Sequence, residues 1–432
     1  MKDTIIRMAE EMLPQMSIRR RDFHKHAESG WFEMRTSSLI ARRLTELGYE
    51  VLVGEDVCDR DTRMGVPSDE RLEKHYAWAA EHGADPEFLP ATRGGMTGVI
   101  GILRCGEGPT VAMRFDIDAL GVNESSDPDH IPAREGFVSI NPGTMHACGH
   151  DGHATIGLGV AEVLMAIRSS LHGTVKLIFQ PAEEGVRGAK SIVEKGHLND
   201  ADFVLGNHIN GIVVGAPEAK AVAGVYASLA TTKLDAIFHG RAAHAGARPN
   251  EGKNALLAAA TAVMNLNAIP RHNAGTTRIN VGTLHAGSGR NVIADTAVME
   301  LEIRGANTAI NEYMTEYATR ILEAAAQMHG CTCEVKLMGA AEALCSDKVL
   351  ADRIEKVCAD LAIPFTPTTP GGGSEDFSYM MNRVQTRGGL AVFFRTCCNI
   401  TGGAHNVRFD FEEEVMVIGV KVFCGAALEL MS

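Results

Sequence analysis

Short apolar runs separated by turn residues fill much of the chain, and this pattern is typical of an α/β protein with buried strands. Residues 4–47 differ, because the apolar positions Ile5, Met8 and Met12 follow helical spacing until Pro14 interrupts it. From residue 98 onwards the pattern changes to strands. The predicted buried strands are 99–103, 110–115, 175–179, 202–206 and 390–394. We therefore expect an α/β fold with a mostly parallel sheet.

A polar section rich in Arg, Asp and Glu separates the helical start from the first buried strand. It covers roughly residues 55–95 and contains Trp78. A long segment of this composition is more typical of a surface loop than of a folding unit of its own. We interpret it as an insertion on the surface of the first domain.

Residues 228–339 show a different order of elements, which predicts a second domain. The order is strand, helix, strand, strand, helix, strand, and this βαββαβ arrangement is the split ferredoxin-like motif. The predicted elements are 232–238, 254–267, 278–284, 292–304, 310–328 and 331–338. Because strands of the first type resume afterwards, the catalytic domain is predicted to be discontinuous, with parts 1–227 and 340–432 around an inserted dimerisation or lid domain.

Length and charge narrow the class of protein. A chain of 432 residues is long enough for two domains. The formal net charge of −13 argues against a nucleic-acid surface. The sequence has no apolar run long enough to span a bilayer, and its first twenty residues lack a signal-peptide core. We therefore expect no membrane partner, a cytoplasmic location and reduced thiols.

The run 145–153 predicts a metal centre. It reads Met-His-Ala-Cys-Gly-His-Asp-Gly-His and places three histidines, one cysteine and one aspartate in nine residues. These side chains bind transition metals. Any one of them alone would more often be an ordinary core or surface residue, but their clustering favours metal binding. An apolar stretch, 156–161, follows and predicts a helix, so we expect the ligands in a loop that enters this helix.

Further candidate ligands stand where predicted strands end. Asp116 and Asp118 follow one strand, the Glu183-Glu184 doublet follows another, and His208 follows a third. His405 lies in the loop after the last strand. In an open α/β sheet the ligand crevice lies at the carboxyl ends of the strands. The doublet alone would more often be a solvated turn, but together these positions predict one site.

The number of ligands favours two metal ions and hydrolysis. A catalytic zinc ion keeps about three protein ligands. This chain offers more, namely Cys148, His150, Glu184, His208 and His405. A pair of ions about 3.5–4 Å apart polarises a carbonyl and activates water. Adjacent side chains at a strand end point in different directions, so we assign Glu184 to metal binding and Glu183 to general-base catalysis.

The combination of motifs resembles the M20 metallopeptidases, in the amidohydrolase branch that includes hippurate and indole-acetyl-amino-acid hydrolases. The resemblance covers nearly the whole chain in the expected order. Within this branch it is strongest to amidohydrolases of p-aminobenzoyl-glutamate, through residues 20–24, 27–31, 63–65 and 371–377. The motifs that carry the family resemblance are 114–120 (RFDIDAL), 145–151 (MHACGHD), 179–185 (FQPAEEG) and 240–245 (GRAAHA).

The resemblance implies how the ligands divide between two ions. Cys148 stands where other members have a bridging aspartate. Glu184 and His405 would complete one ion, and His150 and His208 the other. Zinc and manganese both remain open, because thiolate and imidazole suit zinc while carboxylates also suit manganese.

The resemblance also implies roles outside the ligand set. Asp118 resembles an acid that orients a metal-bound histidine. His244 resembles a histidine that stabilises the oxyanion in the site of a second chain, which predicts a dimer. Asn291 and Arg304 resemble residues that bind the carboxylate of the substrate. From the residues alone, Arg304 would be a surface ion pair and His244 a loop residue.

These observations predict a metal-dependent amidohydrolase that cleaves p-aminobenzoyl-glutamate to p-aminobenzoate and glutamate. One alternative is a hippurate-like or other N-acyl-amino-acid amidohydrolase. An alternative of another class is a weakly active partner subunit in a hetero-oligomeric hydrolase. Such a subunit would be expected to have lost metal ligands, whereas this chain keeps every candidate ligand. The expected assembly is a homodimer or a hetero-oligomer with a related subunit.

Overall fold

The computed structural model describes residues 1–371 and 373–432, which divide into two units. Unit 1 comprises 1–226, 345–370 and 376–432, and unit 2 comprises 227–344 and 371–375. The predicted inserted segment, 228–339, lies within unit 2. The chain of unit 2 extends beyond that prediction, to Leu344, and takes in the short segment 371–375.

Unit 1 contains an eight-stranded sheet in the order β1-β2-β4-β3-β5-β14-β6-β12. Its centre, β4-β3-β5-β14, is parallel, whereas β1, β2 and the β14–β6 pair are antiparallel. The predicted α/β fold with a mostly parallel sheet is confirmed. The strands are β1 (Glu50–Val53), β2 (Val99–Arg104), β3 (Thr110–Asp116), β4 (Thr174–Gln180), β5 (Phe203–Gly211), β6 (Ala221–Val222), β12 (Phe365–Thr366) and β14 (Leu390–Cys398).

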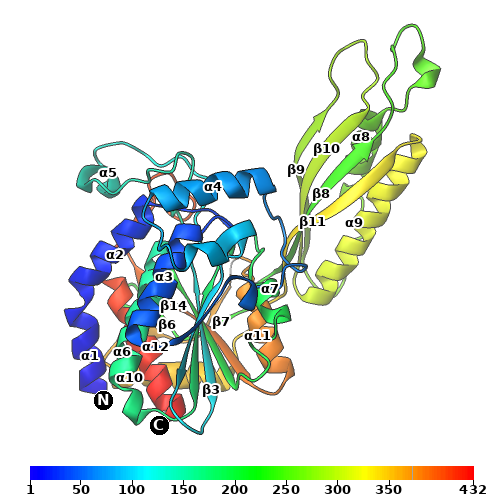
Figure 1. The fold of residues 1–432 in the computed structure, drawn as a ribbon. Helices are drawn as coiled ribbons and strands as arrows, with labels where there is room; N and C mark the ends of the chain where they lie inside the picture. Colours follow the sequence, from blue (N-terminus) through cyan, green and yellow to red (C-terminus); the bar gives the residue numbers. More distant parts are fainter. Residues whose placement is uncertain (372) are drawn as a thin grey trace. The chain divides into compact units, whose positions relative to one another are not determined.

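Helices cover both faces of this sheet (Figure 1). The central pair on one face, α6 and α12, is buried on nearly every side, as expected of helices that are apolar all round. Gly157 allows α6 to approach closely, because a Cβ there would lie 2.6 Å from the Phe179 ring. The helices of unit 1 are α1 (Lys2–Glu11), α2 (Leu13–Lys25), α3 (Met34–Leu47), α4 (Asp69–Glu81), α5 (Ile131–Glu135), α6 (His150–Ala166), α7 (Ala189–Glu194), α10 (Lys348–Asp360), α11 (Phe377–Thr386) and α12 (Val415–Met431).

Two predicted boundaries near the candidate site were wrong. Strand β5 does not end before His208 but continues to Gly211, because its pairing with β14 runs on from Phe203 to that residue. Helix α6 begins at His150 rather than near residue 156, directly after Gly149 with its φ of +91°. Polar residues of the first turn hid this start from the apolar pattern. His150 therefore lies on a helix and His208 within a strand.

The 55–95 insertion packs against the first part of unit 1. It contains α4 and two short 3₁₀ segments, Gly54–Asp56 and Leu89–Gly95. Leu72, Ala79 and Leu89 are buried against Phe32 and Met34. A small apolar cluster thus joins the insertion to the segment that contains Phe32 and Met34.

Unit 2 contains a four-stranded antiparallel sheet in the order β11-β8-β10-β9. Helices α8 and α9 pack against one face of this sheet, and Asn254 and Asn307 cap their first turns. The structure has the predicted βαββαβ order. The elements are β8 (Ala230–His239), α8 (Ala255–Asn267), β9 (Thr277–Ala286), β10 (Thr296–Gly305), α9 (Thr308–Met328) and β11 (Thr332–Ala341). Two small sheets complete the chain: β7 (Val225–Tyr226) with β13 (Thr369–Pro370), and β15 (Ile400–Thr401) with β16 (Asp410–Phe411).

Among the described residues, no helix combines the length and the apolar character needed to cross a lipid bilayer.

Candidate metal centre

Two groups of candidate ligands meet in unit 1 and share one residue. Cys148, His150 and His208 form the first group, and Cys148, Glu184 and His405 form the second. Within each group the ligand atoms lie within 4.8 Å of one another. The Cys148 Sγ is 3.4 Å from His208 Nε2, and Glu184 Oε1 is 3.5 Å from His405 Nε2. The structure therefore brings all five predicted ligands together.

Four parts of unit 1 position these side chains. Cys148 lies just before α6, His150 is the first residue of this helix, and His208 lies in β5. Glu184 follows β4 in the segment 181–188, which we call the glutamate turn. His405 lies between β15 and β16 with a φ of +63°, and its backbone N–H donates to Ala147 O at 2.7 Å. This hydrogen bond holds His405 next to the segment that carries Cys148.

In the part of the chain that the structure describes, two buried side-chain atoms of the candidate ligands have no hydrogen-bond partner, and their chemistry fits divalent metal ions. Among the described residues, His150 Nε2 and Glu184 Oε1 are buried and have no hydrogen-bond partner, and they lie 4.0 Å apart. A buried polar atom without a partner is costly, so native proteins rarely retain one without a reason. Thiolate, imidazole and carboxylate together are a suitable donor set for transition metals. The site therefore supports divalent metal binding.

Burial keeps the thiol of Cys148 protonated when no ion is bound. It raises the pKa of Cys148 to about 12, and the nearby Glu184 carboxylate adds to this rise. A metal ion binds the thiolate, so it must displace this proton.

Asp118 organises both the histidine and the glutamate doublet. Its Oδ1 accepts a hydrogen bond from His150 Nδ1 at 3.2 Å and from the Glu183 N–H at 3.1 Å. Its Oδ2 accepts from the Glu184 N–H at 2.9 Å. Since Nδ1 carries the proton in this arrangement, the Nε2 lone pair of His150 is available for a metal ion.

Asp116 and His153 form a third cluster with His150, but their atoms already have partners. His153 Nδ1 donates to Asp116, and His153 Nε2 accepts from the Ile209 N–H at 2.8 Å. Arg114 also donates to Asp116 at 2.6 Å. Burial alone would raise the pKa of Asp116, but Arg114 and the histidines hold it well below its usual value. This cluster therefore supports the site and does not compete for the metal.

Two acids that hold the glutamate turn were not predicted from the sequence. Glu33 accepts from the Ala182 N–H at 2.7 Å, and burial together with the charge of Asp118 raises the pKa of Glu33 to about 8. Asp376 accepts from the N–H groups of Gly188 and Ala189 at 3.0 and 2.9 Å. Neither acid stands in a sequence motif typical of metal ligands, so only the fold reveals its contact with the turn.

In unit 2, His244 has a defined tautomer. Its Nδ1 accepts backbone N–H groups of Gly246 and Ala247 at 3.2 and 3.1 Å. In the neutral form of this imidazole the proton is therefore on Nε2, and the side chain is exposed at the surface of unit 2. Asn291 lies beside it, because the Ala245 N–H donates to Asn291 O at 2.9 Å.

Arg304 lies at the other end of unit 2. It pairs with Glu302 on the same strand, β10. Thr296 and Arg304 are eight residues apart on this strand, which at about 3.3 Å per residue corresponds to roughly 26 Å. Asn291 lies beyond Thr296, where the ladder continues past β10 through the His244–Val292 bridge. One copy of unit 2 therefore cannot bring Asn291 and Arg304 to the same carboxylate.

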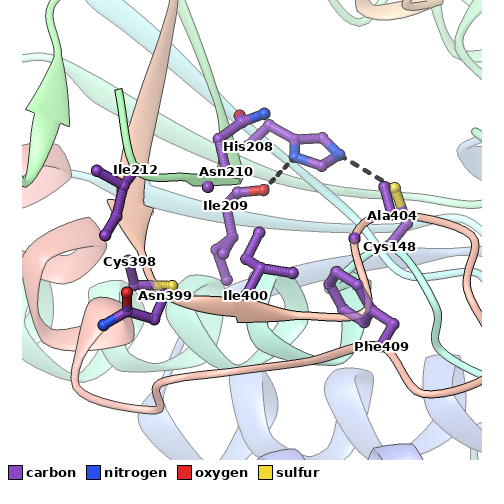
Figure 2. Close-up of a pocket in the computed structure, with 12 residues that line it drawn as sticks. Cys148, His208, Ile209, Asn210, Ile212, Cys398, Asn399, Ile400, Ala404 and Phe409 are labelled. Carbon is purple, nitrogen blue, oxygen red and sulfur yellow. Dashed lines mark hydrogen bonds between the residues drawn. The ribbon is translucent and has the colours of Figure 1, made fainter. Parts of the chain in front are cut away.

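A cavity of about 410 Å³ opens beside the candidate metal ligands in unit 1 (Figure 2). This volume is in the usual range for a small-molecule site. Apolar and amide side chains both line its wall, so it suits a small molecule with an apolar part and a few polar groups. Its lining includes Cys148, His208, Asn210, Asn399, Ile400 and Phe409.

Comparison with known proteins agrees with this geometry. The sequence profile described as Peptidase family M20/M25/M40 matches residues 112–429. This chain belongs to peptidase family M20. The predicted family and the predicted enzyme class, a hydrolase, are thereby confirmed.

Relatives of this M20 chain match nearly its full length. It is 45% identical to indole-3-acetyl-aspartic acid hydrolase of Enterobacter agglomerans, with 97% of this chain and 96% of that protein covered. It is 43% identical to one of the subunits of p-aminobenzoyl-glutamate hydrolase of Escherichia coli, with 99% and 98% covered. The crystal structure of an aminobenzoyl-glutamate utilization protein from Klebsiella pneumoniae superposes with a TM-score of 0.83 at 40% identity, with 98% and 97% covered.

Proposed function

We propose that this chain is a dinuclear metallo-amidohydrolase that cleaves the amide bond of p-aminobenzoyl-glutamate. The observation that carries the proposal is the pair of ligand groups that share Cys148, with Glu183 beside them. Two relatives above 40% identity are named for amides that join an aromatic acyl group to an acidic amino acid. The substrate class is therefore an N-acyl acidic amino acid.

The ligand groups support a division into two metal positions. Cys148 is shared, Glu184 and His405 complete one position, and His150 and His208 complete the other. When bound, zinc or manganese ions supply Lewis-acid polarisation of the substrate carbonyl and lower the pKa of water. Asp118 keeps His150 in the tautomer that this arrangement needs.

Glu183 is the proposed general base. The two backbone bonds to Asp118 fix the doublet, so Glu184 can hold a metal ion while Glu183 accepts a proton from the attacking water. Glu183 then returns this proton to the nitrogen of the leaving amino acid. His244 of a second chain, with its proton on Nε2, is the proposed donor to the developing oxyanion.

A dimer is part of this proposal. Asn291 and Arg304 lie too far apart in one copy to hold one carboxylate, so a joint role would require residues of two copies. An arginine fork suits a free carboxylate, which would have to displace Glu302 from Arg304. The E. coli relative is named as one subunit of its hydrolase, which supports a hetero-oligomer as the alternative to a homodimer.

Indole-3-acetyl-aspartate is the second candidate substrate, because the relative named for it is 45% identical. The test compares kcat/KM of the purified chain, loaded with manganese or zinc, for p-aminobenzoyl-glutamate, indole-3-acetyl-aspartate and hippurate. We expect the highest value for p-aminobenzoyl-glutamate and at least a tenfold lower value for hippurate, whose glycine lacks the second carboxylate. One missing polar contact of about 1.4 kcal/mol gives this factor.

Two other results would change the assignment. A preference for indole-3-acetyl-aspartate would move the substrate to the second candidate, and equal rates with hippurate would contradict recognition of the acidic amino acid. No turnover of any amide by the metal-loaded chain would support the partner-subunit interpretation.

A further inference from the structure

The glutamate turn has a strained backbone. Ala182 and Val186 have φ values of +51° and +59°, and neither is a glycine. A positive φ is a genuine outlier for a β-branched residue such as Val186. Such conformations persist only where several surrounding contacts hold them in place. They cluster at functional sites. The contacts that hold this turn are therefore part of the site.

Carboxyl groups hold the N–H groups of this turn, as described above. Glu33, Asp118 and Asp376 together accept four backbone N–H groups of the turn and the N–H of Ala189, which follows it. In each of these contacts the carboxyl oxygen is the acceptor, so the contacts fix the N–H side of the turn and not its carbonyl oxygens. A donor is needed to fix the direction of the Glu184 peptide from its carbonyl side.

Arg187 provides that contact. Its Nε donates to the carbonyl oxygen of Glu184 at 2.9 Å, and its backbone N–H donates to Ala182 O at 3.1 Å. Its Nη1 donates to the carbonyl oxygen of Gly65 at 3.2 Å. One guanidinium thus joins a proposed metal ligand to the 55–95 insertion.

The space around this guanidinium is tight. A Cβ on Gly30 would lie 2.3 Å from Arg187 Nη2 and 3.0 Å from Cα of Ala182. Only glycine leaves room for both the arginine and the turn at this point. The orientation of Arg187 is therefore set by its surroundings.

The 55–95 insertion holds the Gly65 carbonyl, which is the acceptor for Arg187, in a fixed position. Trp31 Nε1 donates to Met64 O at 2.8 Å, and Arg63 Nη1 donates to Gly94 O at 2.7 Å and Gly95 O at 3.1 Å. Trp31 is fully buried, and Met64 is 5% exposed. These bonds anchor the segment 63–65 next to the Gly65 carbonyl.

We infer that Arg187 is a positioning residue for Glu184. The 55–95 insertion contributes by holding Arg187 in place through the Gly65 carbonyl. The inference deepens the proposed function, since it concerns a ligand of the same metal centre. Loss of Arg187 should let the Glu184 peptide rotate. The affinity of the metal position that contains Glu184 and His405 should then fall.

The test uses Arg187→Met and Arg187→Lys in the full chain, with Arg60→Met as a matched control. Arg60 is an exposed arginine of the same insertion that pairs with Glu55. Metal affinity is measured by competition with a chromogenic chelator, without substrate. We expect one of the two dissociation constants to rise about 10–100-fold in Arg187→Met, the usual effect of losing a residue that orients a ligand. Arg187→Lys should show a smaller rise, because one ammonium replaces two directed donors.

Further readouts separate positioning from simple support of the fold. At saturating metal we expect kcat to fall while KM stays within about twofold of the unmutated chain. Trp31→Phe, which leaves Arg187 intact but frees Met64 O, should weaken the same metal position to a lesser degree. It also serves as the test if Arg187→Met does not fold.

A lower melting temperature with unchanged metal affinity in the Arg187 variants, or in Trp31→Phe if they do not fold, would overturn the inference. An equal loss of metal affinity in Arg60→Met would overturn it as well. Because chelator competition needs no substrate, the result stands apart from the substrate assignment. A chain that binds metal tightly but cleaves none of the three amides would contradict the proposed function alone.

Discussion

Glu183→Gln is expected to lower kcat about 10²–10⁴-fold, the usual contribution of a general base. Glutamine keeps the size of the side chain but cannot accept the proton of the attacking water. The backbone N–H of residue 183 still donates to Asp118, so the turn should keep its conformation. Steady-state kinetics on the best of the three amides, together with metal analysis, measures both effects.

Metal content distinguishes a lost base from a lost ligand. We expect Glu183→Gln to bind as much metal as the unmutated chain, whereas Glu184→Gln should lose part of it. Glu11→Gln is a suitable control, because Glu11 is an exposed acid paired with Arg7 on α1. Near-normal turnover in Glu183→Gln would show that another group takes the proton.

Asp118→Asn is expected to weaken metal binding about 10–100-fold and to lower kcat at subsaturating metal. The carboxylate accepts three hydrogen bonds, from His150 Nδ1 and from two backbone N–H groups. Asparagine has one acceptor oxygen, and its NH₂ group would face a donor. At least one buried N–H would lose its partner, at a cost of about 1–3 kcal/mol in the free energy of unfolding.

Chelator competition and thermal unfolding of the metal-free chain measure these two effects. Asp352→Asn is the control, since Asp352 is an exposed acid paired with Lys348 on α10. Unchanged metal affinity in Asp118→Asn would contradict the assignment of Asp118 as the residue that orients His150 and the glutamate doublet.

The fold and the convergence of the five candidate ligands could be predicted because their signals are local. Apolar strands that end in acids or histidines identify the crevice of a parallel sheet. The nine residues 145–153 contain two of the five ligands, and the glutamate doublet directly follows a strand. The βαββαβ order was likewise visible from periodicity alone. These features depend on neighbours within a few residues.

The residues that hold the glutamate turn in place could not be predicted, because their contacts join residues that are distant in the sequence. Glu33 is 149 residues from the N–H that it accepts at Ala182. Arg187 bonds to Gly65, 122 residues away. Each looks like an ordinary charged residue in its own segment. The interpretation of 55–95 as a surface insertion therefore missed its contact with the glutamate turn.

Hydrogen bonding between neighbouring strands also explains why the end of β5 was predicted wrongly. A strand continues as long as its neighbour offers hydrogen bonds, so β5 runs past His208 beside β14. In unit 2, the strand that separates Asn291 from Arg304 keeps the two residues apart in one copy. Their proximity in the sequence gave no indication of this distance.

The proposed mechanism requires two metal ions in each chain. Metal titration addresses this requirement: a chelator removes the metal, and amide hydrolysis is followed while manganese or zinc is added back in known amounts. We expect no turnover in the metal-free chain and a rise in activity that ends at two ions per chain. Full activity without metal, or a plateau at one ion per chain, would contradict the dinuclear mechanism.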